Sequence, residues 1–335
     1  MSDSFFAGLE SFIEENPVDI AESIQSEDQI EIQQDIADAK EDVAELDRKI
    51  EKSDILLCQL FAMREHIENY GLDRTFLAMF NRNGELAAIV KRKIPSCEAF
   101  DVSTASELAQ VCCEGIDNAI DRVNLMFRDD FMKLYSAIRR AFQSWTSDAE
   151  SSKNTLIALK TQLKNVKKVP NISIKAYTPN EFKKWISIKP IELRKKALNA
   201  LHKLQTWSYK EGSSDKGAKI ADSLEEDIKT IEKAEPKKET IDLTLWPTGA
   251  ITSAIDYAIK ACNSINETNK TYEGFWKTGF NQGKVLALFG MNVAYERQNV
   301  IRVARTSWRN LNTLCSIDDA LIHSVIRMAK AAVEQ

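Results

Sequence analysis

Residues that form tight turns are scarce in this chain of 335 residues, which contains 11 glycines and 7 prolines. All-β sandwiches and barrels need many short strands joined by Gly- and Pro-rich turns, so the composition disfavours them. Hydrophobic residues make up 44% of the chain, which is enough for a globular core. The sequence therefore predicts a mainly α fold with long amphipathic helices, a coiled-coil-like leader at the N-terminus, and at most a small two-stranded β element in the C-terminal half.

Side chains suited to catalysis and metal binding are also few. There are 3 histidines, none in a metal-ligating spacing, and 6 cysteines that form no CxxC pair. No GxGxxG or GxSxG motif occurs. We therefore predict no catalytic, cofactor-binding or metal-binding residue, no small-molecule substrate and no enzyme activity. No run of about 18 apolar residues is present, so the sequence also predicts no membrane-spanning helix.

The net charge of −5 conceals an uneven distribution along the chain. Residues 1–98 hold 22 acidic and 10 basic residues, a net charge of −12, whereas residues 99–335 hold 28 and 35, a net charge of +7. A basic segment can lie against a polyanion, and an acidic segment can screen it from that polyanion. On charge alone, the alternative of an acidic helix that is merely solvated stays open.

Apolar residues follow a heptad spacing within a helix predicted over about residues 30–69. Nine of the eleven positions in this seam are apolar, which indicates a partner helix in the same chain or in another one. Gly71 is placed to end the helix in the left-handed conformation. The seam positions are Ile32, Ile36, Ala39, Val43, Leu46, Ile50, Ser53, Leu57, Leu60, Arg64 and Ile67.

The charge distribution and the apolar spacing predict three parts of the chain. We expect an acidic leader at 1–98, a long helical hairpin at 99–168 and a basic helical domain at 169–335. Within the last part, residues 171–177 and 241–245 alternate between apolar and polar side chains, as strands do.

Helix boundaries follow from the periodicity and from capping signals. The two helices of the hairpin are predicted at 105–146 and 150–168. The last two helices are predicted at 290–311 and 317–333, and a capping-box pattern that begins at Ser316 opens the final one.

Basic residues recur in clusters beyond residue 98, often near tryptophan. Such clusters can contact the phosphates of nucleic acid without sequence preference, although basic residues on a solvated helix face give the same pattern. The predicted contact residues are Arg139, Arg140, Lys164, Lys167, Lys168, Arg194, Lys195, Lys196, Arg302, Arg305 and Arg309.

Three features together resemble the internal head proteins, or prohead core proteins, of contractile-tailed and jumbo bacteriophages. They are the acidic coiled-coil leader, the linker Pro95-Ser96-Cys97-Glu98-Ala99-Phe100, and the long amphipathic helix from Ser106 to Trp145 that ends in basic and aromatic residues. The resemblance covers about residues 30–165. It implies a virion structural protein inside the capsid, present in the host cytoplasm during assembly, whose mature part is packed with genomic DNA and in some members is ejected with it.

The resemblance also implies proteolytic maturation after a glutamate in a small-x-Glu motif. Carried over to this sequence, Ser96 is the specificity residue, Glu98 is the cut position and Ala99 begins the mature chain. Glu10 and Glu107 are secondary candidates for cleavage. Removal of residues 1–98 would change the net charge from −5 to +7.

The implied partners are prohead core or scaffold proteins, capsid proteins, the prohead protease and genomic DNA, with possible self-association through the leader. Two other classes of protein fit the same patterns. One is an unprocessed cytoplasmic coiled-coil adaptor, and the other is a helical effector whose amphipathic helices act on membranes.

Overall fold

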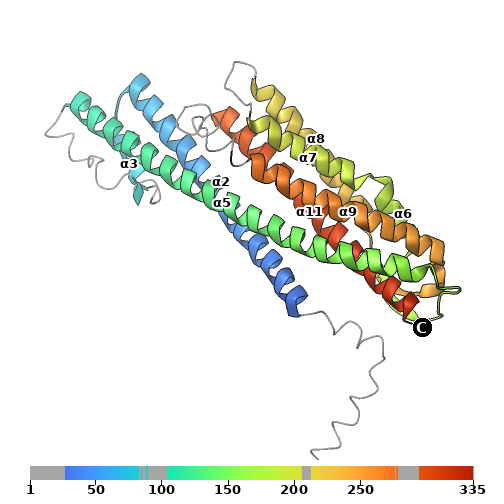
Figure 1. Cartoon of the computed structure of the whole chain (residues 1–335). Coiled ribbons are helices and arrows are strands. Elements are labelled where there is room, and N and C mark those ends of the chain that lie inside the picture. The colour runs from blue at the N-terminus through green and yellow to red at the C-terminus, as the bar shows by residue number, and fades with distance from the viewer. Residues whose placement is uncertain are drawn as a thin grey trace, which may run out of the picture.

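The computed structural model describes residues 27–82, 84, 88–89, 104–205, 213–275, 277 and 294–334. These residues form a bundle of long helices and one two-stranded antiparallel sheet (Figure 1). The prediction of a mainly α fold with a small β element is therefore confirmed.

Helix α5 (Ala105–Leu163) is the longest described element, with 59 residues. Its start is fixed by a capping box, because the Thr104 hydroxyl accepts from the Glu107 amide while the Glu107 carboxylate accepts from the Thr104 amide. The buried stripe continues through Trp145 and Ala149, where a break was predicted. The predicted hairpin at 99–168 is thus wrong, since both of its helices belong to α5.

Helix α2 (Glu27–Tyr70) packs along α5, which is its main partner. Nine of the eleven predicted seam positions are buried, Ile36 and Leu57 among them. The helix ends at Gly71, whose φ is 77° and whose N–H donates to the Ile67 carbonyl at 2.9 Å, as predicted. The heptad seam therefore finds its partner within the same chain.

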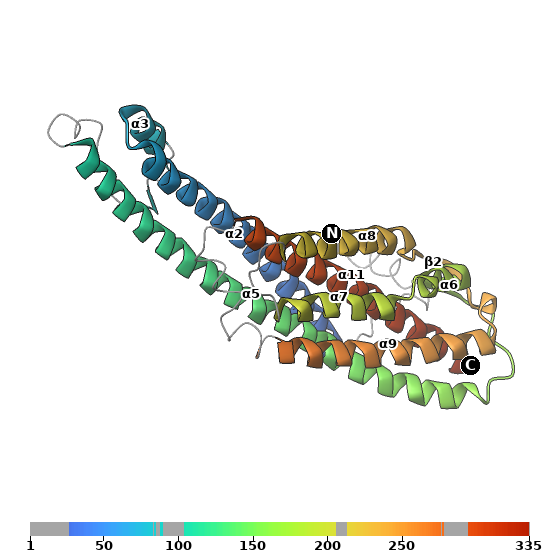
Figure 2. The same ribbon diagram turned by 90° about the horizontal axis from the view of Figure 1, so that it is seen from above.

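Two hydrophobic cores divide the molecule into an arm and a body. The arm consists of residues 56–72, residues 108–123 of α5, and α3 (Arg74–Arg82). These segments pack around buried side chains such as Leu60 and Ile116. The rest of α2 and α5 belongs to the body core. Figures 1 and 2 show the arm projecting beyond the other helices. The acidic helix contributes to both cores, so α2 packs as part of the same folded unit as the helices that follow it.

Four further helices belong to the body. Among the described residues, no helix is long and apolar enough to cross a membrane. The side chain of Thr178 caps the first of the four by accepting from the Glu181 amide at 3.2 Å, as its sequence predicted. The four are α6 (Pro179–Ser187), α7 (Pro190–Gln205), α8 (Ser213–Ala234) and α9 (Thr248–Phe275).

The β ribbon confirms the first strand predicted from alternation and corrects the second. Of the range predicted at 241–245, only residues 241 and 242 belong to a strand, and residues 243–245 form a 3-10 turn. Strand β1 (Ser173–Tyr177) pairs antiparallel with β2 (Lys238–Asp242), and a 3-10 turn follows at Leu243–Leu245. The Trp246 indole donates to the Tyr177 carbonyl at 3.0 Å and covers the ribbon from the helical side.

Helix α11 (Ala294–Val333) is continuous over 40 residues, so the predicted division into two helices is wrong. The Ser316 hydroxyl does not cap a helix, but donates to the Asn312 carbonyl one turn earlier at 2.7 Å. Hydroxyls that bond in this way are tolerated inside helices. As a result, Asp318 and Asp319 lie in the middle of a helix at the centre of the body.

Candidate functional site: buried polar centres and a lysine groove

The first polar centre is the carboxylate of Asp318, which is fully buried. It accepts from the Trp185 indole of α6 at 2.9 Å, from the Tyr257 hydroxyl of α9 at 2.9 Å, and from the Arg194 guanidinium of α7. Burial opposes the charge of Arg194, yet the groups around it, Asp318 among them, raise its pKa overall. Burial and the Asp318 carboxylate also raise the pKa of Tyr257, so its hydroxyl keeps the proton that it donates. One carboxylate thus joins α11 to three other helices.

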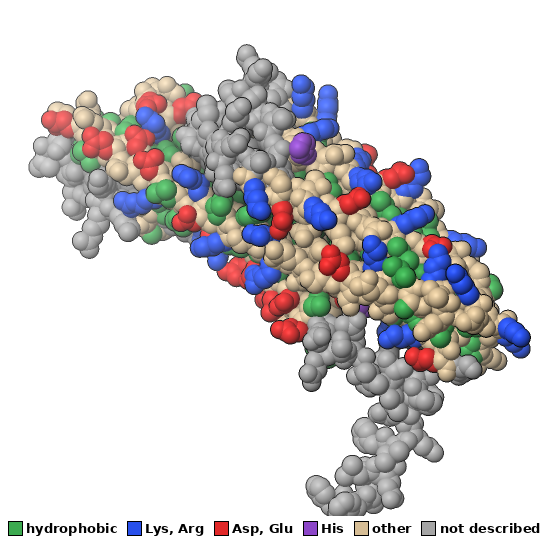
Figure 3. Space-filling view, in the orientation of Figure 1, with side chains coloured by type: hydrophobic (Ala, Val, Ile, Leu, Met, Phe, Trp, Pro, Cys, Tyr) green, Lys and Arg blue, Asp and Glu red, His purple; other side chains and the backbone are tan. Residues whose placement is uncertain are grey.

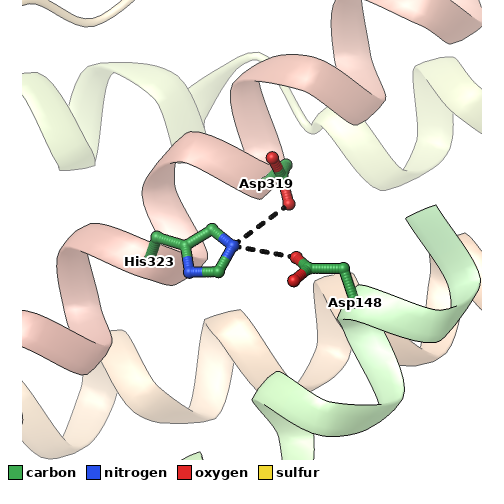
Figure 4. Close-up of side chains that lie close together, drawn as sticks. All are labelled: Asp148, Asp319 and His323. Atoms are coloured by element: carbon green, nitrogen blue, oxygen red, sulfur yellow. Dashed lines mark hydrogen bonds and ion pairs between the residues drawn. The ribbon is translucent and has the colours of Figure 1, made fainter. Parts of the chain in front are cut away.

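The second polar centre, the Asp148 cluster, consists of Asp148 of α5 and of Asp319 and His323 of α11. Figure 4 shows the three side chains pointing toward one another across the gap between the two helices. His323 Nε2 lies 2.8 Å from Asp148 Oδ2 and 3.6 Å from Asp319 Oδ1. Asp148 is almost fully buried, at 2% side-chain exposure, and the other two are largely covered.

The protons of the Asp148 cluster are shared unequally. Burial and the hydrogen bond with Asp148 raise the pKa of Asp319 to about 7. Burial alone would raise the pKa of Asp148, but hydrogen bonds with His323 and Asp319 outweigh it and lower that pKa. Burial alone would lower the pKa of His323, but its bond with Asp148 and the charge of Asp319 raise it. The arrangement therefore favours the charged forms of His323 and Asp148, and it shifts the titration of Asp319 toward neutral pH.

The donor set of the Asp148 cluster could serve a metal ion, since a histidine nitrogen and two carboxylate oxygens lie within 4.8 Å of one another. However, ligands of a tetrahedral ion at about 2.0–2.2 Å stand farther apart than the 2.8 Å between His323 Nε2 and Asp148 Oδ2. That separation is a normal hydrogen bond. The geometry fits a proton held between side chains better than it fits a coordinated cation.

Helix α2 reaches the same cluster from the other side. Gln33 Nε2 donates to Asp319 Oδ2 at 3.2 Å, and Lys40 Nζ donates to the Ser316 hydroxyl at 2.9 Å. Burial lowers the pKa of Lys40, although the charge of Asp319 opposes this. The Cys262 thiol of α9 lies close enough for Asp148 to affect it, but burial raises its pKa to about 12 and keeps it protonated. Through these hydrogen bonds the cluster joins α2, α5 and α11.

Sequence reasoning did not single out these polar centres. Asp148 falls on the apolar stripe of α5 between Trp145 and Ser152, and Asp319 lies one turn from His323 on the same face of α11. A charged residue in the apolar phase of a helix is a usable signal for a buried polar contact. The signal was missed because the two helices were predicted to break near these positions.

The structure pairs most of the arginines that were predicted to contact nucleic acid. Arg194 is fully buried against Asp318, so the prediction that it contacts nucleic acid is wrong. The other five make ion pairs with carboxylates of other helices, which weakens their attraction for phosphate. The pairs are Arg139–Glu273, Arg140–Asp42, Arg302–Glu225, Arg305–Asp47 and Arg309–Glu232.

Exposed lysines gather instead at a groove between α7 and α8, which has a volume of about 480 Å³. The lysine groove is lined by Lys195, Lys196 and Lys203 of α7 and by Lys219 of α8, with Glu192 as its acidic member. The space-filling view shows Lys and Arg side chains crowding the part of the molecule that holds α6, α7 and α8 (Figure 3). The sequence predicted two of these four lysines as contacts, and helix packing brings in the other two.

Two acidic residues of α8 are paired with an arginine outside the lysine groove, and a third is paired with a lysine of the groove. Asp222 and Glu225 both bind Arg302 of α11, at 2.7 and 2.8 Å. Asp227 binds Lys196 at 2.7 Å and offsets one of the four lysines. The groove therefore keeps a positive balance although α8 as a whole is acidic.

The remaining predicted contacts, Lys164, Lys167 and Lys168, are exposed where α5 ends. Lys167 and Lys168 border a second hollow of about 820 Å³, together with Ala332 and Val333 at the end of α11. This site is separate in sequence and in lining from the lysine groove.

The predicted cleavage residues are only partly open to structural description. Ser96, Glu98, Ala99 and Glu10 lie outside the described residues. Glu107 lies in the first turn of α5, where its carboxylate is bound in the capping box, and hydrogen bonds to the Thr104 amide and hydroxyl lower its pKa. A helical bond held in this way is a poor protease substrate, so Glu107 is disfavoured as a cut position.

Comparison of the chain with protein-family models, with curated proteins and with solved structures finds no match. Its function must therefore be argued from its own residues.

Proposed function

We propose that the chain is a non-enzymatic internal head protein of a tailed bacteriophage, which is incorporated into the prohead, cut after Glu98, and packed against genomic DNA. The proposal combines the resemblance of residues 30–165 to that family with the helical fold and the charge distribution on its surface. In this function the helices provide a rigid shape, and the basic surface provides the contact with DNA.

The lysine groove is the observation that carries the proposal. Lys195 of α7 and Lys219 of α8 both line the groove, and their ammonium groups make no ion pair among those found in the described residues. The groove between two packed helices is too narrow for a duplex, but its rims can contact the phosphates of one strand. Lysine contacts to phosphate are independent of base sequence and weaken as salt rises, which suits a protein packed along a whole genome.

A binding assay with a fluorescein-labelled duplex of random sequence tests the DNA contact. We expect the variant K195Q/K219Q to bind more weakly than the original protein, and its slope of log K against log salt to fall by roughly 1–2. The control variant K183Q/K184Q removes the same charge from exposed positions on α6 and should bind as the original does. Equal weakening in both variants would contradict the groove as the contact, and no binding at low salt would overturn the DNA part of the proposal.

The virion part of the proposal is tested by N-terminal mass spectrometry of purified particles. We expect a species whose first residue is Ala99. Particles that contain only the uncut chain would refute the cleavage, and particles without the chain would refute the proposed location.

A second candidate function, an unprocessed helical interaction protein, is favoured by the burial of α2. The seam positions of α2 are occupied by α5, as expected of a helix that remains part of the folded chain. Co-expression with a prohead protease distinguishes the two, since only a head protein should be cut at Glu98.

A further inference from the structure

We propose that cleavage after Glu98 does not release helix α2, so that the processed protein is a complex of two fragments held together by the packing of α2 on α5 and α11. The inference rests on the proposed function for the existence of the cut, but its physical basis is the described contact between α2 and the rest of the chain. It concerns residues 27–72, which lie well before the cut position.

The apolar contact is the first part of the argument. Helix α2 supplies buried side chains to the body core and to the arm core, and both cores would open if α2 left. Exposure of a continuous apolar face of this length to water is strongly unfavourable. The buried side chains that α2 contributes are Ile36, Ala39, Val43, Leu46, Ile50, Leu56, Leu57, Leu60, Phe61 and Ile67.

The polar contact is the second part. Asp54 of α2 binds Arg297 of α11, which is fully buried. Without α2 the guanidinium of Arg297 would lose this charged hydrogen-bond partner, so the buried pair ties α2 to α11. Gln33 adds its hydrogen bond to Asp319 in the Asp148 cluster.

Charge complementarity at the edge of the contact is the third part. Asp42 of α2 binds Arg140 of α5, and Asp47 binds Arg305 of α11 at 2.8 Å. The acidic helix therefore lies on basic residues of the part that would remain after cleavage. This arrangement holds α2 in its register along two neighbouring helices.

The consequence concerns the charge of the mature protein. The sequence alone suggested that loss of residues 1–98 changes the net charge to +7. If α2 stays bound, Arg140 and Arg305 remain paired after cleavage. The lysine groove, which α2 does not line, is then a basic surface that is available both before and after the cut.

Cleavage of the purified full-length chain at an engineered site tests the inference. A recognition sequence for a site-specific protease is inserted after Glu98, and the cut protein is examined by size-exclusion chromatography with light scattering. We expect both fragments to elute together with the mass of the uncut chain and to separate only in denaturant. Separation without denaturant at neutral pH would overturn the inference.

Two charge-reversal variants make the test specific for the contact. D42K/D47K places lysines opposite Arg140 and Arg305. After the cut, the small fragment should dissociate from this variant at a protein concentration at least tenfold higher than from the cut original protein. E41K/E65K makes the same change of net charge at exposed positions of α2 and should retain the fragment like the original. If both variants release it alike, general charge and not the described contact holds α2.

The outcome is independent of the proposed function, because the engineered cut needs no phage protease. In particles, the inference predicts peptides from residues 27–70 together with the species that begins at Ala99. Particles with that species but without those peptides would refute the inference and leave the proposed function standing.

Discussion

Asp318 and Asp319 are neighbours on α11, but they belong to two polar centres with opposite properties. Asp318 accepts hydrogen bonds from three donors, one of them the guanidinium of Arg194. Asp319 faces another carboxylate, and its pKa is raised to about 7 by burial and by the hydrogen bond with Asp148. Adjacent residues of a helix point about 100° apart, so each aspartate meets different helices. The partners of each carboxylate, and not its depth alone, distinguish the two centres: Asp318 meets hydrogen-bond donors, whereas Asp319 meets another carboxylate.

The largest expected effect comes from breaking the Asp318 centre. Replacement Arg194→Met leaves the carboxylate of Asp318 buried without its cationic partner, which should lower the free energy of unfolding by about 3–5 kcal/mol. Urea denaturation followed by circular dichroism measures this. The control Arg309→Met breaks an exposed pair with Glu232 and should cost less than about 1 kcal/mol. Similar losses in the two variants would contradict the central role of Asp318.

A smaller effect, which depends on pH, is expected at Asp319. The folded pKa of about 7 lies above the ordinary value of 3.8, so the folded state holds the proton more tightly and stability falls as pH rises between these values. Asparagine is neutral and can donate to Asp148 as the protonated acid does. Replacement Asp319→Asn should therefore change stability little at about pH 5 and raise it by roughly 1–2 kcal/mol at about pH 8.5. Urea denaturation at both pH values tests this, and a difference that does not vary with pH would contradict it.

His323 acts in the same direction in this pH range. Its pKa is raised in the folded state, so the stability that it contributes is present below its ordinary value of 6.5 and is lost as pH rises through the raised value. The charge of Asp319 is one of the causes of the raised pKa of His323, so replacement Asp319→Asn also reduces that shift, and the comparison at equal pH reports both groups.

The smallest expected effect concerns Gln33 of α2, which contacts Asp319 but not Asp318. The hydrogen bond from Gln33 favours the charged form of Asp319. Replacement Gln33→Ala should raise the pKa of Asp319 further, and should lower stability by about 0.5–1.5 kcal/mol at alkaline pH and by less at acid pH. Carbon-13 NMR titration of the carboxyl groups measures the pKa. The control Gln34→Ala removes a bond to Asp38 within α2 and should leave the pKa of Asp319 unchanged.

The sequence predicted those features that depend on helix phase alone. The heptad seam of α2, its end at Gly71 and the start of α6 at Thr178 are each set by residues close together in the chain. Strand β1 also followed from alternation, whereas the second strand lies three residues earlier than its predicted range of 241–245. Local patterns such as the seam and the two helix ends carry their own physical cause, so they were confirmed.

The predicted breaks in α5 and α11 were wrong for one common reason. Breaks were predicted after residue 146 and, from a capping-box pattern, at Ser316. At both places a hydroxyl bonds a carbonyl one turn earlier, as Thr146 does with Phe142 at 2.8 Å. Such residues can also be buried on the apolar face, as Ser152 is. Helix continuity here depends on tertiary packing, which propensity does not contain.

The pairing of charges could not be predicted from the sequence. Arg305 and Asp47 lie 258 positions apart, and Arg194 and Asp318 lie 124 apart. The pattern of basic residues identifies candidates for a phosphate contact, but only the arrangement of helices separates paired arginines from the lysines of the groove. For that reason the predicted contact residues were a mixture of buried, paired and exposed side chains.

The length of α5, 59 residues, makes one continuous helix part of both the arm and the body. An uninterrupted helix of this length is about 90 Å long, and it runs from the tip of the arm to the far end of the body. Helix α2 spans the same junction beside it, so the arm has no single-stranded hinge about which to swing. A structure that bound the tip of the arm would therefore also fix the orientation of the body and of the lysine groove on it.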